Sequence, residues 1–341
     1  MKKKIIVTGG AGYIGSHTVV ELFNAGFEPV IVDNFSNADK SVVARINEIT
    51  GSNIELHEGD CCDEVFLKGV IEAEGAVDGF IHFAAYKAVG ESVKKPLDYY
   101  RNNFDSLLTV LKAMMEYSIP HFVFSSSCTV YGQAAVLPVT EETPVQKQES
   151  PYGNTKKVCE EMINDAVNSG AKLKCISLRY FNPIGAHASA KIGELPLGVP
   201  QNLVPFITQA AAGIRRQLTV FGNDYDTPDG TCIRDYIHVV DLAKAHVKSL
   251  EYLGSRKADN FYDVFNVGTG KGNSVLEVIK AFEKASGQKL IYRIGPRRTG
   301  DIVQIYGNVN KANKLLDWKT EMTLEDSLRD AWEWQKGLGR S

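Results

Sequence analysis

Tyr152 and Lys156 are the pair of residues in this sequence whose types and spacing best suit proton-transfer chemistry. They lie four residues apart at the start of a predicted helix, so they are expected to share one face, roughly 6 Å apart along the axis. A free tyrosine has a pKa of about 10, and a neighbouring cation lowers it by roughly one to three units. Tyr152 is therefore a candidate general acid/base, although a Tyr-x-x-x-Lys spacing also arises by chance in many helices.

A predicted strand that ends in three hydroxyl residues comes before this helix. Residues 122–127 read Phe-Val-Phe-Ser-Ser-Ser, an apolar run typical of a buried strand. Open α/β sheets place their chemistry at the carboxyl ends of the strands, so Ser127 is expected to meet Tyr152 over one substrate. Together the two observations favour a catalytic site over a chance spacing.

A glycine-rich turn near the start of the chain indicates a dinucleotide site. Residues 8–17 read Thr-Gly-Gly-Ala-Gly-Tyr-Ile-Gly-Ser-His, with a predicted strand before them and a predicted helix, 16–25, after them. Glycines at these spacings let the backbone approach a pyrophosphate, whose charge then lies at the amino end of the helix. This context makes the Gly-x-Gly-x-x-Gly pattern more specific than the bare glycines would be.

An acidic residue follows the second predicted strand, 29–32. Asp33 lies 18 residues beyond Gly15, where a carboxylate accepts hydrogen bonds from the adenosine ribose and repels a 2′-phosphate. The sequence therefore predicts NAD and not NADP as the cofactor. The alternative is a structural aspartate in a turn.

Further strand ends follow along the same predicted edge. A strand at 54–57 leads to Asp60, expected at the adenine edge, and a buried strand at 79–85 ends in small residues that leave room for the dinucleotide. Lys87 comes next, and its position favours contact with cofactor or substrate, the alternative being a solvated loop lysine. With the strand at 175–180, six or seven strands alternating with helices predict a doubly wound parallel sheet, an α/β fold of Rossmann type.

The helix predicted at 97–117 carries a wide apolar stripe. Its apolar residues, at positions 100, 104, 107, 108, 111, 114 and 115, cover more than one sheet-facing surface needs. A second buried face is implied, either in a dimer that pairs this helix with the helix at 152–168 or under another part of the same chain.

The second half of the chain differs in composition. Residues 181–230 are rich in Gly, Pro and Asn, with a short helix at 203–213, which favours a lid-like substrate region. Residues 233–250 are expected to return to the main sheet. The remaining predicted elements are a helix at 275–286, a strand at 290–292 and a final helix at 324–335.

Composition places the 341-residue chain among globular proteins that bind small molecules. A net charge of −3, from 38 basic and 41 acidic residues, gives no basic patch for nucleic acid or an anionic membrane. The apolar run 5–7 is far too short for a signal peptide. Six cysteines without Cys-x-x-Cys spacing or a matched histidine pair predict a cytoplasmic protein with reduced thiols and no metal.

Several longer stretches carry a resemblance to a known family. They are residues 8–17, 82–93, 125–132, 178–187, 221–225, 229–238 and the arginine turn at 297–301. On these motifs, which span nearly the whole length, the chain resembles the extended short-chain dehydrogenase/reductase superfamily and, within it, the UDP-glucose (UDP-galactose) 4-epimerases. The resemblance implies inversion at carbon 4 of UDP-glucose and UDP-galactose through a 4-keto intermediate, with NAD recycled, in a homodimer.

The resemblance also assigns site residues. The implied catalytic triad is Ser127, Tyr152 and Lys156. The implied cofactor contacts are Gly9, Gly12, Tyr13, Ile14, Gly15, Asp33, Asn34, Asp60, Cys61, Phe83, Ala84, Lys87, Asn102, Tyr152, Lys156 and Tyr180. The implied substrate contacts are Ser127, Tyr152, Asn182, Asn202, Leu203, Phe221, Arg234, Arg298, Asp301 and Ile305. Asn102 is open to a one-residue shift because Asn103 adjoins it.

The implied domain division follows the change in composition. Residues 1–183, with 235–260 returning to them, are expected to form an NAD-binding Rossmann domain, and residues 184–341 a smaller α/β domain for the UDP-sugar. Ile305 stands where the resembling family narrows or widens the hexose pocket. Preference for the plain hexoses, with weaker turnover of UDP-N-acetylglucosamine and UDP-N-acetylgalactosamine, is expected unless Tyr306 takes that position.

Two rival functions share this fold. A nucleotide-sugar 4,6-dehydratase needs an added acid and base, which that family carries as Asp-Glu directly after the triad hydroxyl; here the residues are Cys128 and Thr129. A non-catalytic NAD-sensing regulator typically lacks the tyrosine or the lysine, and both are present. The epimerase interpretation is therefore favoured.

Overall fold

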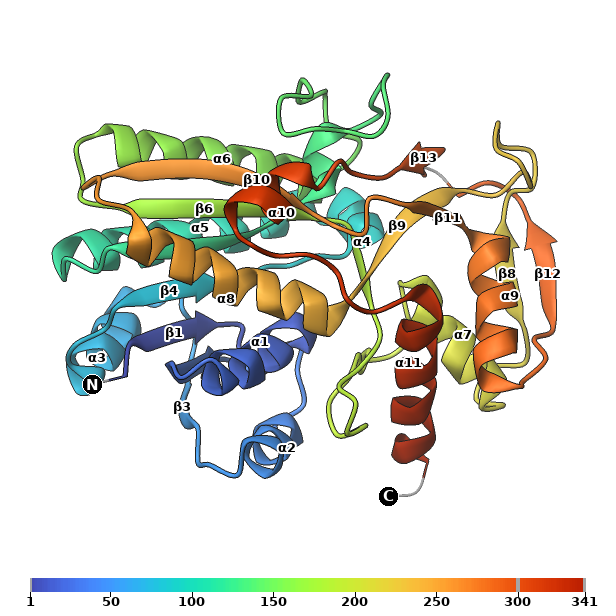
Figure 1. The fold of residues 1–341 in the computed structure, drawn as a ribbon, viewed down its shortest axis with the longest axis horizontal. Helices are drawn as coiled ribbons and strands as arrows, with labels where there is room; N and C mark the ends of the chain where they lie inside the picture. Colours follow the sequence, from blue (N-terminus) through green and yellow to red (C-terminus); the bar gives the residue numbers. More distant parts are fainter. Residues whose placement is uncertain (1, 299–300, 340–341) are drawn as a thin grey trace.

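The computed structural model describes residues 2–298 and 301–339 (Figure 1). Its main layer is a parallel sheet of seven strands in the order β10-β6-β5-β4-β1-β2-β3. The strands are β1 (Lys4–Thr8), β2 (Glu28–Asp33), β3 (Glu55–Glu58), β4 (Gly79–His82), β5 (His121–Ser127), β6 (Lys174–Tyr180) and β10 (Phe261–Val267). The predicted doubly wound α/β fold is confirmed.

Helical layers cover both faces of this sheet, because each strand carries apolar side chains on both sides. Along β1, Ile5 and Val7 point into one core and Ile6 into the other, as strand alternation requires. The first face packs against α1 and α8, and the second against α5 and α6 (Figure 1). The helices of this part are α1 (Tyr13–Asn24), α2 (Ser41–Thr50), α3 (Glu64–Glu74), α4 (Val89–Lys94), α5 (Pro96–Glu116), α6 (Pro151–Asn168) and α8 (Val239–Ser255).

The carboxyl ends of the central strands form one edge. Thr8 of β1 lies opposite His82 of β4, and Ser127 of β5 lies opposite Tyr180 of β6. The winding direction reverses between β1 and β4, since β2 and β3 extend the sheet one way and β4 to β6 the other. Open α/β sheets bind ligands in the crevice at such a switch point.

A smaller α/β region lies at one end of the main sheet (Figure 1). Its core is apolar and includes Ile207, Phe282 and Leu328. Its elements are β7 (Asn182–Ile184), α7 (Leu203–Ala211), β8 (Leu218–Phe221), β9 (Ile233–His238), β11 (Gly272–Ser274), α9 (Val275–Ser286), β12 (Tyr292–Gly295), β13 (Gln304–Ile305) and α11 (Leu324–Leu338). β9 pairs with β7, β11 and β13, while β8 pairs with β12. A short helix, α10 (Asn310–Leu315), packs on β10.

Four sequence predictions differ from the structure. Residues 233–250 return only in part, because β9 lies in the smaller sheet and α8 alone packs over the main one. The seventh main strand is β10, which the sequence did not predict because Asp263 and Asn266 interrupt its apolar pattern. The strand expected at 290–292 lies further along the chain, as β12. Residues 181–230 hold two strands besides the predicted helix.

Candidate active site

The catalytic candidates lie at the start of α6. Ser150 caps this helix by accepting a hydrogen bond from the Gly153 amide (3.1 Å), and Pro151 occupies the first turn. Tyr152 and Lys156 follow one turn apart and are buried, at 8% and 3% exposure. The helix predicted from their spacing is confirmed.

Lys156 is anchored to β5. Its Nζ donates to the carbonyl oxygen of Ser125 (2.6 Å) and lies 4.7 Å from the centre of the Phe124 ring. Burial lowers the pKa of Lys156 to about 8, and the nearby Cys159 and Glu160 oppose the shift. The amine is therefore held, desolvated, beside the end of the strand that carries the candidate hydroxyl.

The Ser127 side chain lies near enough to the Tyr152 phenol to influence its pKa, and Ser127 Oγ accepts a hydrogen bond from the Thr129 amide (3.2 Å). Burial raises the pKa of Tyr152, Tyr180 adds to the rise, and Ser127 opposes it. The expectation that Lys156 lowers this pKa is wrong for the protein chain by itself. Desolvation of the phenol is the largest cause of the shift.

Tyr180 ends β6 on the same edge. Its hydroxyl hydrogen-bonds with Ser125 Oγ (2.5 Å), and burial raises the pKa of Tyr180 to about 12. In the sheet register Tyr180 lies directly opposite Ser127. Three residues implied by the resemblance, Ser127, Tyr152 and Tyr180, are thus brought together.

The glycine turn forms a cradle in which side chains have no room. Gly9 has a φ of 72°, and a Cβ there would lie 2.8 Å from the Ala84 amide nitrogen. A Cβ on Gly15 would lie 2.2 Å from the Gly9 carbonyl oxygen, and one on Gly12 would lie 3.2 Å from it. The turn packs against the residues after β4 at the amino end of α1, where a pyrophosphate is favoured.

The far end of the cradle is formed by Asp33 and its neighbours. Asp33 Oδ2 accepts from the Ala11 amide (3.0 Å) and Oδ1 from the Phe35 amide (2.8 Å), so this carboxylate does have the structural role considered above. Each oxygen keeps a further lone pair for a ribose hydroxyl. Asn34 Nδ2 donates to Asp60 Oδ2 (3.2 Å), which brings two more implied contacts together.

Four further implied cofactor contacts are held in place by a hydrogen bond or by core packing. The Tyr13 hydroxyl donates to the Gly185 carbonyl oxygen (2.7 Å) and so joins the glycine turn to the segment after β7. Ile14 and Phe83 pack against the first core, while Cys61 is buried in the second.

Asn103, which the sequence analysis gave only as the alternative to Asn102, organises the loop after β4. Its Oδ1 accepts from the Tyr86 amide (2.8 Å), while its Nδ2 donates to the Tyr86 carbonyl (3.1 Å) and to Thr155 Oγ1 (3.0 Å). The implied contact Asn102 is less buried and donates to Asn103 Oδ1 (3.0 Å). The signal that could have found Asn103 is its position one turn before Leu107 on the buried stripe.

Glu194, which the sequence analysis also missed, interacts with two of the implied residues, Asn202 and Lys87. Its Oε1 accepts from Asn202 Nδ2 (2.6 Å), and Asn202 immediately precedes Leu203 at the start of α7. Burial raises the pKa of Glu194, and the charge of Lys87 opposes that rise. Exposed Lys87 therefore lies within electrostatic reach of the segment that carries the implied substrate contacts.

The cationic candidates lie in the smaller region. Arg298 donates to Asp301 Oδ1 through Nε (3.1 Å) and Nη2 (2.8 Å), and its guanidinium lies 5.7 Å from the centre of the Phe221 ring. Arg234 Nη1 donates to the Ile233 carbonyl oxygen (2.8 Å). The Phe221 ring is 44% exposed, so a flat base can stack on it beside a phosphate-binding guanidinium.

Ile305 lies where the sheet edge with the candidate triad meets the strands that carry the arginines. β13 places it opposite Arg234, and its buried side chain packs in one cluster with Cys128 and Phe181. Those two residues directly follow Ser127 and Tyr180 in the chain, and Asn182 comes next. The triad edge and the arginine-bearing strands therefore meet at Ile305.

This geometry and the fold define an extended short-chain dehydrogenase/reductase, in which Ser127, Tyr152 and Lys156 lie at one edge of the sheet. The family model described as GDP-mannose 4,6 dehydratase matches residues 6–331. UDP-glucose 4-epimerases from Dictyostelium discoideum (49% identity; 97% of this chain and 95% of that one) and Bacillus subtilis (48%; 97% and 96%) are similar over their whole lengths. The chain belongs to the UDP-glucose 4-epimerase family.

Solved structures agree with the sequence relatives. The UDP-glucose 4-epimerase of Stenotrophomonas maltophila, with bound NAD and formylated UDP-arabinopyranose, has a TM-score of 0.95 at 46% identity and 99% coverage of both chains. The Bifidobacterium longum enzyme, in complex with NAD+ and UDP, has a TM-score of 0.94 at 46% identity and 98% coverage of both.

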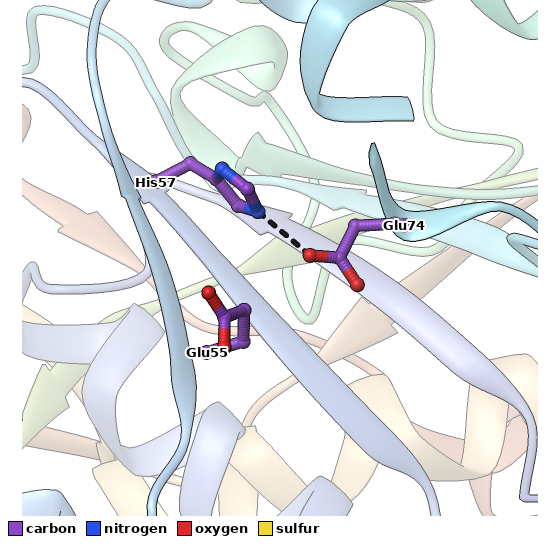
Figure 2. Close-up of side chains that lie close together, drawn as sticks. All are labelled: Glu55, His57 and Glu74. Carbon is purple, nitrogen blue, oxygen red and sulfur yellow. Dashed lines mark hydrogen bonds and ion pairs between the residues drawn. The ribbon is translucent and has the colours of Figure 1, made fainter. Parts of the chain in front are cut away.

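Among the residues that the structure describes, one group of potential metal ligands lies close together, and it is away from the triad. Figure 2 shows Glu55, His57 and Glu74, with His57 Nε2 hydrogen-bonded to Glu74 Oε1 (2.6 Å). Lys4 Nζ lies 2.7 Å from the other oxygen of Glu74. An ammonium already balances this carboxylate, so the group is explained as an ion-pair network that joins β1, β3 and α3.

Within the described part of the chain, no helix combines the length and the apolar character needed to cross a membrane.

Proposed function

We propose that the chain interconverts UDP-glucose and UDP-galactose by inverting carbon 4 of the hexose, with NAD as a recycled hydride carrier. The observation that carries this proposal is the placement of buried Tyr152 and Ser127 near each other at the sheet edge that also bears the glycine cradle. Family membership supports it, since the similar proteins are UDP-glucose 4-epimerases and two of their structures hold NAD.

The cradle fits NAD on the geometry of this chain. The close approaches at Gly9 and Gly15 leave room for backbone alone, as a pyrophosphate contact requires, and the Asp33 carboxylate suits a ribose without a 2′-phosphate. When bound, NAD supplies the hydride acceptor and donor and a positive charge. On this basis the main sheet, which includes β10, forms the NAD-binding domain together with the helices that cover it, α8 among them. The smaller region, which includes β9, forms the UDP-sugar domain.

Tyr152 acts as the acid/base. Its phenolate takes the proton of the 4-hydroxyl as hydride leaves carbon 4, and the phenol returns that proton when hydride comes back to the opposite face of the ketone. Ser127 hydrogen-bonds the same sugar oxygen. Because burial raises the pKa of Tyr152, the phenolate depends on Ser127, on the Lys156 ammonium and on the cofactor's charge for its stability.

The substrate is held by its UDP part. Arg234 and Arg298 grip the diphosphate, since guanidinium forks match phosphate oxygens, and Phe221 stacks on the base. Further UDP contacts come from Asn182, Asn202, Leu203 and Asp301. The hexose is held loosely, so that the 4-keto sugar can turn over while UDP stays fixed.

The description of the matching family model raises a second candidate, 4,6-dehydration. Elimination of the 6-hydroxyl needs an additional acid and base. The residue after Ser127 is Cys128, a thiol whose pKa burial raises to about 12, and Thr129 carries only a hydroxyl. Neither side chain exchanges protons readily at neutral pH, so epimerisation is favoured.

We also propose a homodimer formed through α5 and α6. On α5, Leu97, Leu108 and Met115 are 78%, 40% and 46% exposed, whereas Leu107 and Leu111 are buried. A helix with apolar residues left in water on its outer side favours a second copy over burial within the same chain, and a twofold contact pairs such a face with itself. The six free cysteines support the cytoplasm as the working compartment.

A direct assay tests the function. Purified protein given UDP-galactose without added NAD is expected to form UDP-glucose, measured by chromatography of the nucleotide sugars. Protein freed of its bound cofactor is the control and should regain activity on addition of NAD but not NADP. A 6-deoxy-4-keto product would instead assign the chain to the dehydratases.

A further inference from the structure

A buried ion pair lies directly behind the candidate triad. Glu160 and Arg179 are 7% and 6% exposed, and Arg179 Nη2 donates to Glu160 Oε2 at 2.6 Å. Arg179 Nε also donates to both carboxylate oxygens, at 3.0 and 3.2 Å. Such pairs contribute little net stability because both charges must be desolvated, so a role in positioning is the better explanation.

The ion pair joins α6 to the two strands that carry cleft residues. Glu160 lies one turn beyond Lys156 on α6, and its Oε1 accepts from Ser126 Oγ (2.5 Å). Ser126 precedes Ser127 on β5. Because successive strand residues point to opposite faces, a contact that holds Ser126 toward α6 also orients Ser127 toward the cleft.

The same reasoning applies on β6. Arg179 precedes Tyr180 and lies opposite Ser126 in the strand register. One carboxylate therefore fixes both strand ends against the helix that carries Tyr152.

The hydrogen-bond path continues beyond the ion pair. Arg179 Nη1 donates to the Tyr131 hydroxyl (3.1 Å), and that hydroxyl donates to Asn266 Oδ1 (2.7 Å). Asn266 Nδ2 then donates to the Val139 carbonyl oxygen (3.1 Å). Tyr131 is 0% exposed, so its hydroxyl has no exchange with bulk water to compensate for a lost partner.

The path ends at the strand that carries Ile305. The Val139 amide donates to the Tyr306 carbonyl (3.0 Å), and the Val139 carbonyl also accepts from the Asn308 amide (2.8 Å). A continuous set of hydrogen bonds thus runs from the catalytic helix to the hexose-facing segment.

We propose that Glu160, Arg179 and Tyr131 are positioning residues that set the triad on α6 and β5 in register with the segment carrying Ile305. None of them needs to touch substrate, because they act through the residues next to the cleft. The inference rests on the proposed epimerase function.

Arg179→Lys is the sharpest test. Lysine keeps the positive charge beside Glu160 but lacks the planar fork that reaches Tyr131 at the same time. We expect kcat to fall about 10- to 100-fold, as for a small misplacement of reacting groups, with the dissociation constant for UDP within about twofold. Tyr131→Phe leaves the ion pair intact, removes only the continuation to Asn266, and is expected to lower kcat about tenfold.

The control is Glu321→Gln, which breaks the Lys244–Glu321 pair, also at 2.6 Å, on a remote and exposed surface. It should leave kcat and KM unchanged. Thermal unfolding and bound NAD are measured for every variant, and the reduced-nicotinamide absorbance during turnover reports whether hydride return has slowed.

Slower hydride return in folded, NAD-loaded Arg179→Lys and Tyr131→Phe supports the proposal. If Arg179→Lys does not fold, Tyr131→Phe decides alone. Wild-type kcat in folded Tyr131→Phe, or a loss that merely follows the unfolded fraction, overturns the proposal. Lack of epimerase activity in the wild type would instead remove the proposed function.

Discussion

The Lys156 ammonium donates a 2.6 Å hydrogen bond to the Ser125 carbonyl oxygen, which ties this lysine to β5 two residues before Ser127. A single carbonyl replaces only part of the hydration that a cation has in water, and burial accordingly lowers the pKa of Lys156 to about 8. The site thus holds a cation at a cost in stability, and this cost can be measured.

Lys156→Met is expected to stabilise the cofactor-free protein while removing most turnover. The lysine pKa is 10.5 when solvated and about 8 when folded, so near neutral pH both states are charged and the folded state bears the full penalty. The penalty is of the order of 3 kcal/mol. Between about pH 8 and pH 10.5 the unfolded wild-type chain binds more protons at this lysine than the folded chain does. The free energy of unfolding of the wild type therefore rises with pH, and the difference from the Lys156→Met variant becomes smaller. Urea titrations at about pH 7 and about pH 10 check this, and a constant difference would contradict it.

Tyr152→Phe should lower kcat by roughly 10²- to 10⁴-fold, because it removes the proton acceptor while leaving ring packing intact. The dissociation constant for UDP should change little, since its proposed anchors lie on other elements. Arg298→Ala is the matched comparison and should weaken substrate binding first, because its guanidinium lies beside Phe221 and away from the triad. Near-normal turnover by the tyrosine variant would refute the mechanism.

NAD should remain bound through purification. A redox-neutral cycle gains nothing by releasing it, and the proposed contacts extend along the cofactor from the glycine turn to Asp33 and Asp60. Acid-denatured protein is expected to release about one nicotinamide dinucleotide per chain, measured by enzymatic cycling. Fresh protein that is active yet contains no nicotinamide would rule this out.

The proposed dimer predicts that one charge on the outer face of α5 separates the subunits. Leu108→Arg should convert dimer to monomer in sedimentation velocity, because the side chain is 40% exposed in the single chain and would be desolvated between copies. Ile214→Arg, at a 63% exposed position after α7, is the control and should leave the mass unchanged. Identical masses for wild type and Leu108→Arg would argue against this interface.

The sequence reveals the parts of this site that depend on local spacing. The glycine turn and the Tyr152–Lys156 pair each occupy one turn and the start of one helix, so their geometry follows from consecutive residues. Strand β10 was missed because its polar residues are satisfied from far away: Asp263 pairs with Lys311 at 2.6 Å, and Asn266 accepts from Tyr131.

Neither the burial of a side chain nor a partner distant in sequence can be predicted from local spacing. The Glu160–Arg179 pair joins a helix to a strand 19 residues further on, and no periodicity predicts it. The direction of the Tyr152 pKa shift was wrong for the same reason, since helix spacing shows the neighbouring cation but not the loss of water.

The last prediction concerns the sugars that fit the hexose pocket. Ile305 is 3% exposed and packs with Cys128 beside Ser127, while Tyr306 lines a cavity with Gln133 and other loop residues. Successive strand residues point to opposite faces, which argues for Ile305 as the pocket residue and against the one-residue slip. Isoleucine is smaller than tyrosine and larger than cysteine, so a preference for the plain hexoses with weaker turnover of the 2-acetamido sugars is expected.

Ile305→Ser tests this directly. Pocket contacts of one or two methylenes change discrimination by about 1–3 kcal/mol, so the ratio of kcat/KM for UDP-N-acetylglucosamine to that for UDP-glucose should rise by roughly 10- to 100-fold. Tyr306→Phe, which keeps the ring of the adjacent residue, should leave the ratio unchanged. An unchanged ratio in Ile305→Ser would show that this residue does not line the pocket, and a changed ratio in Tyr306→Phe would assign that role to its neighbour.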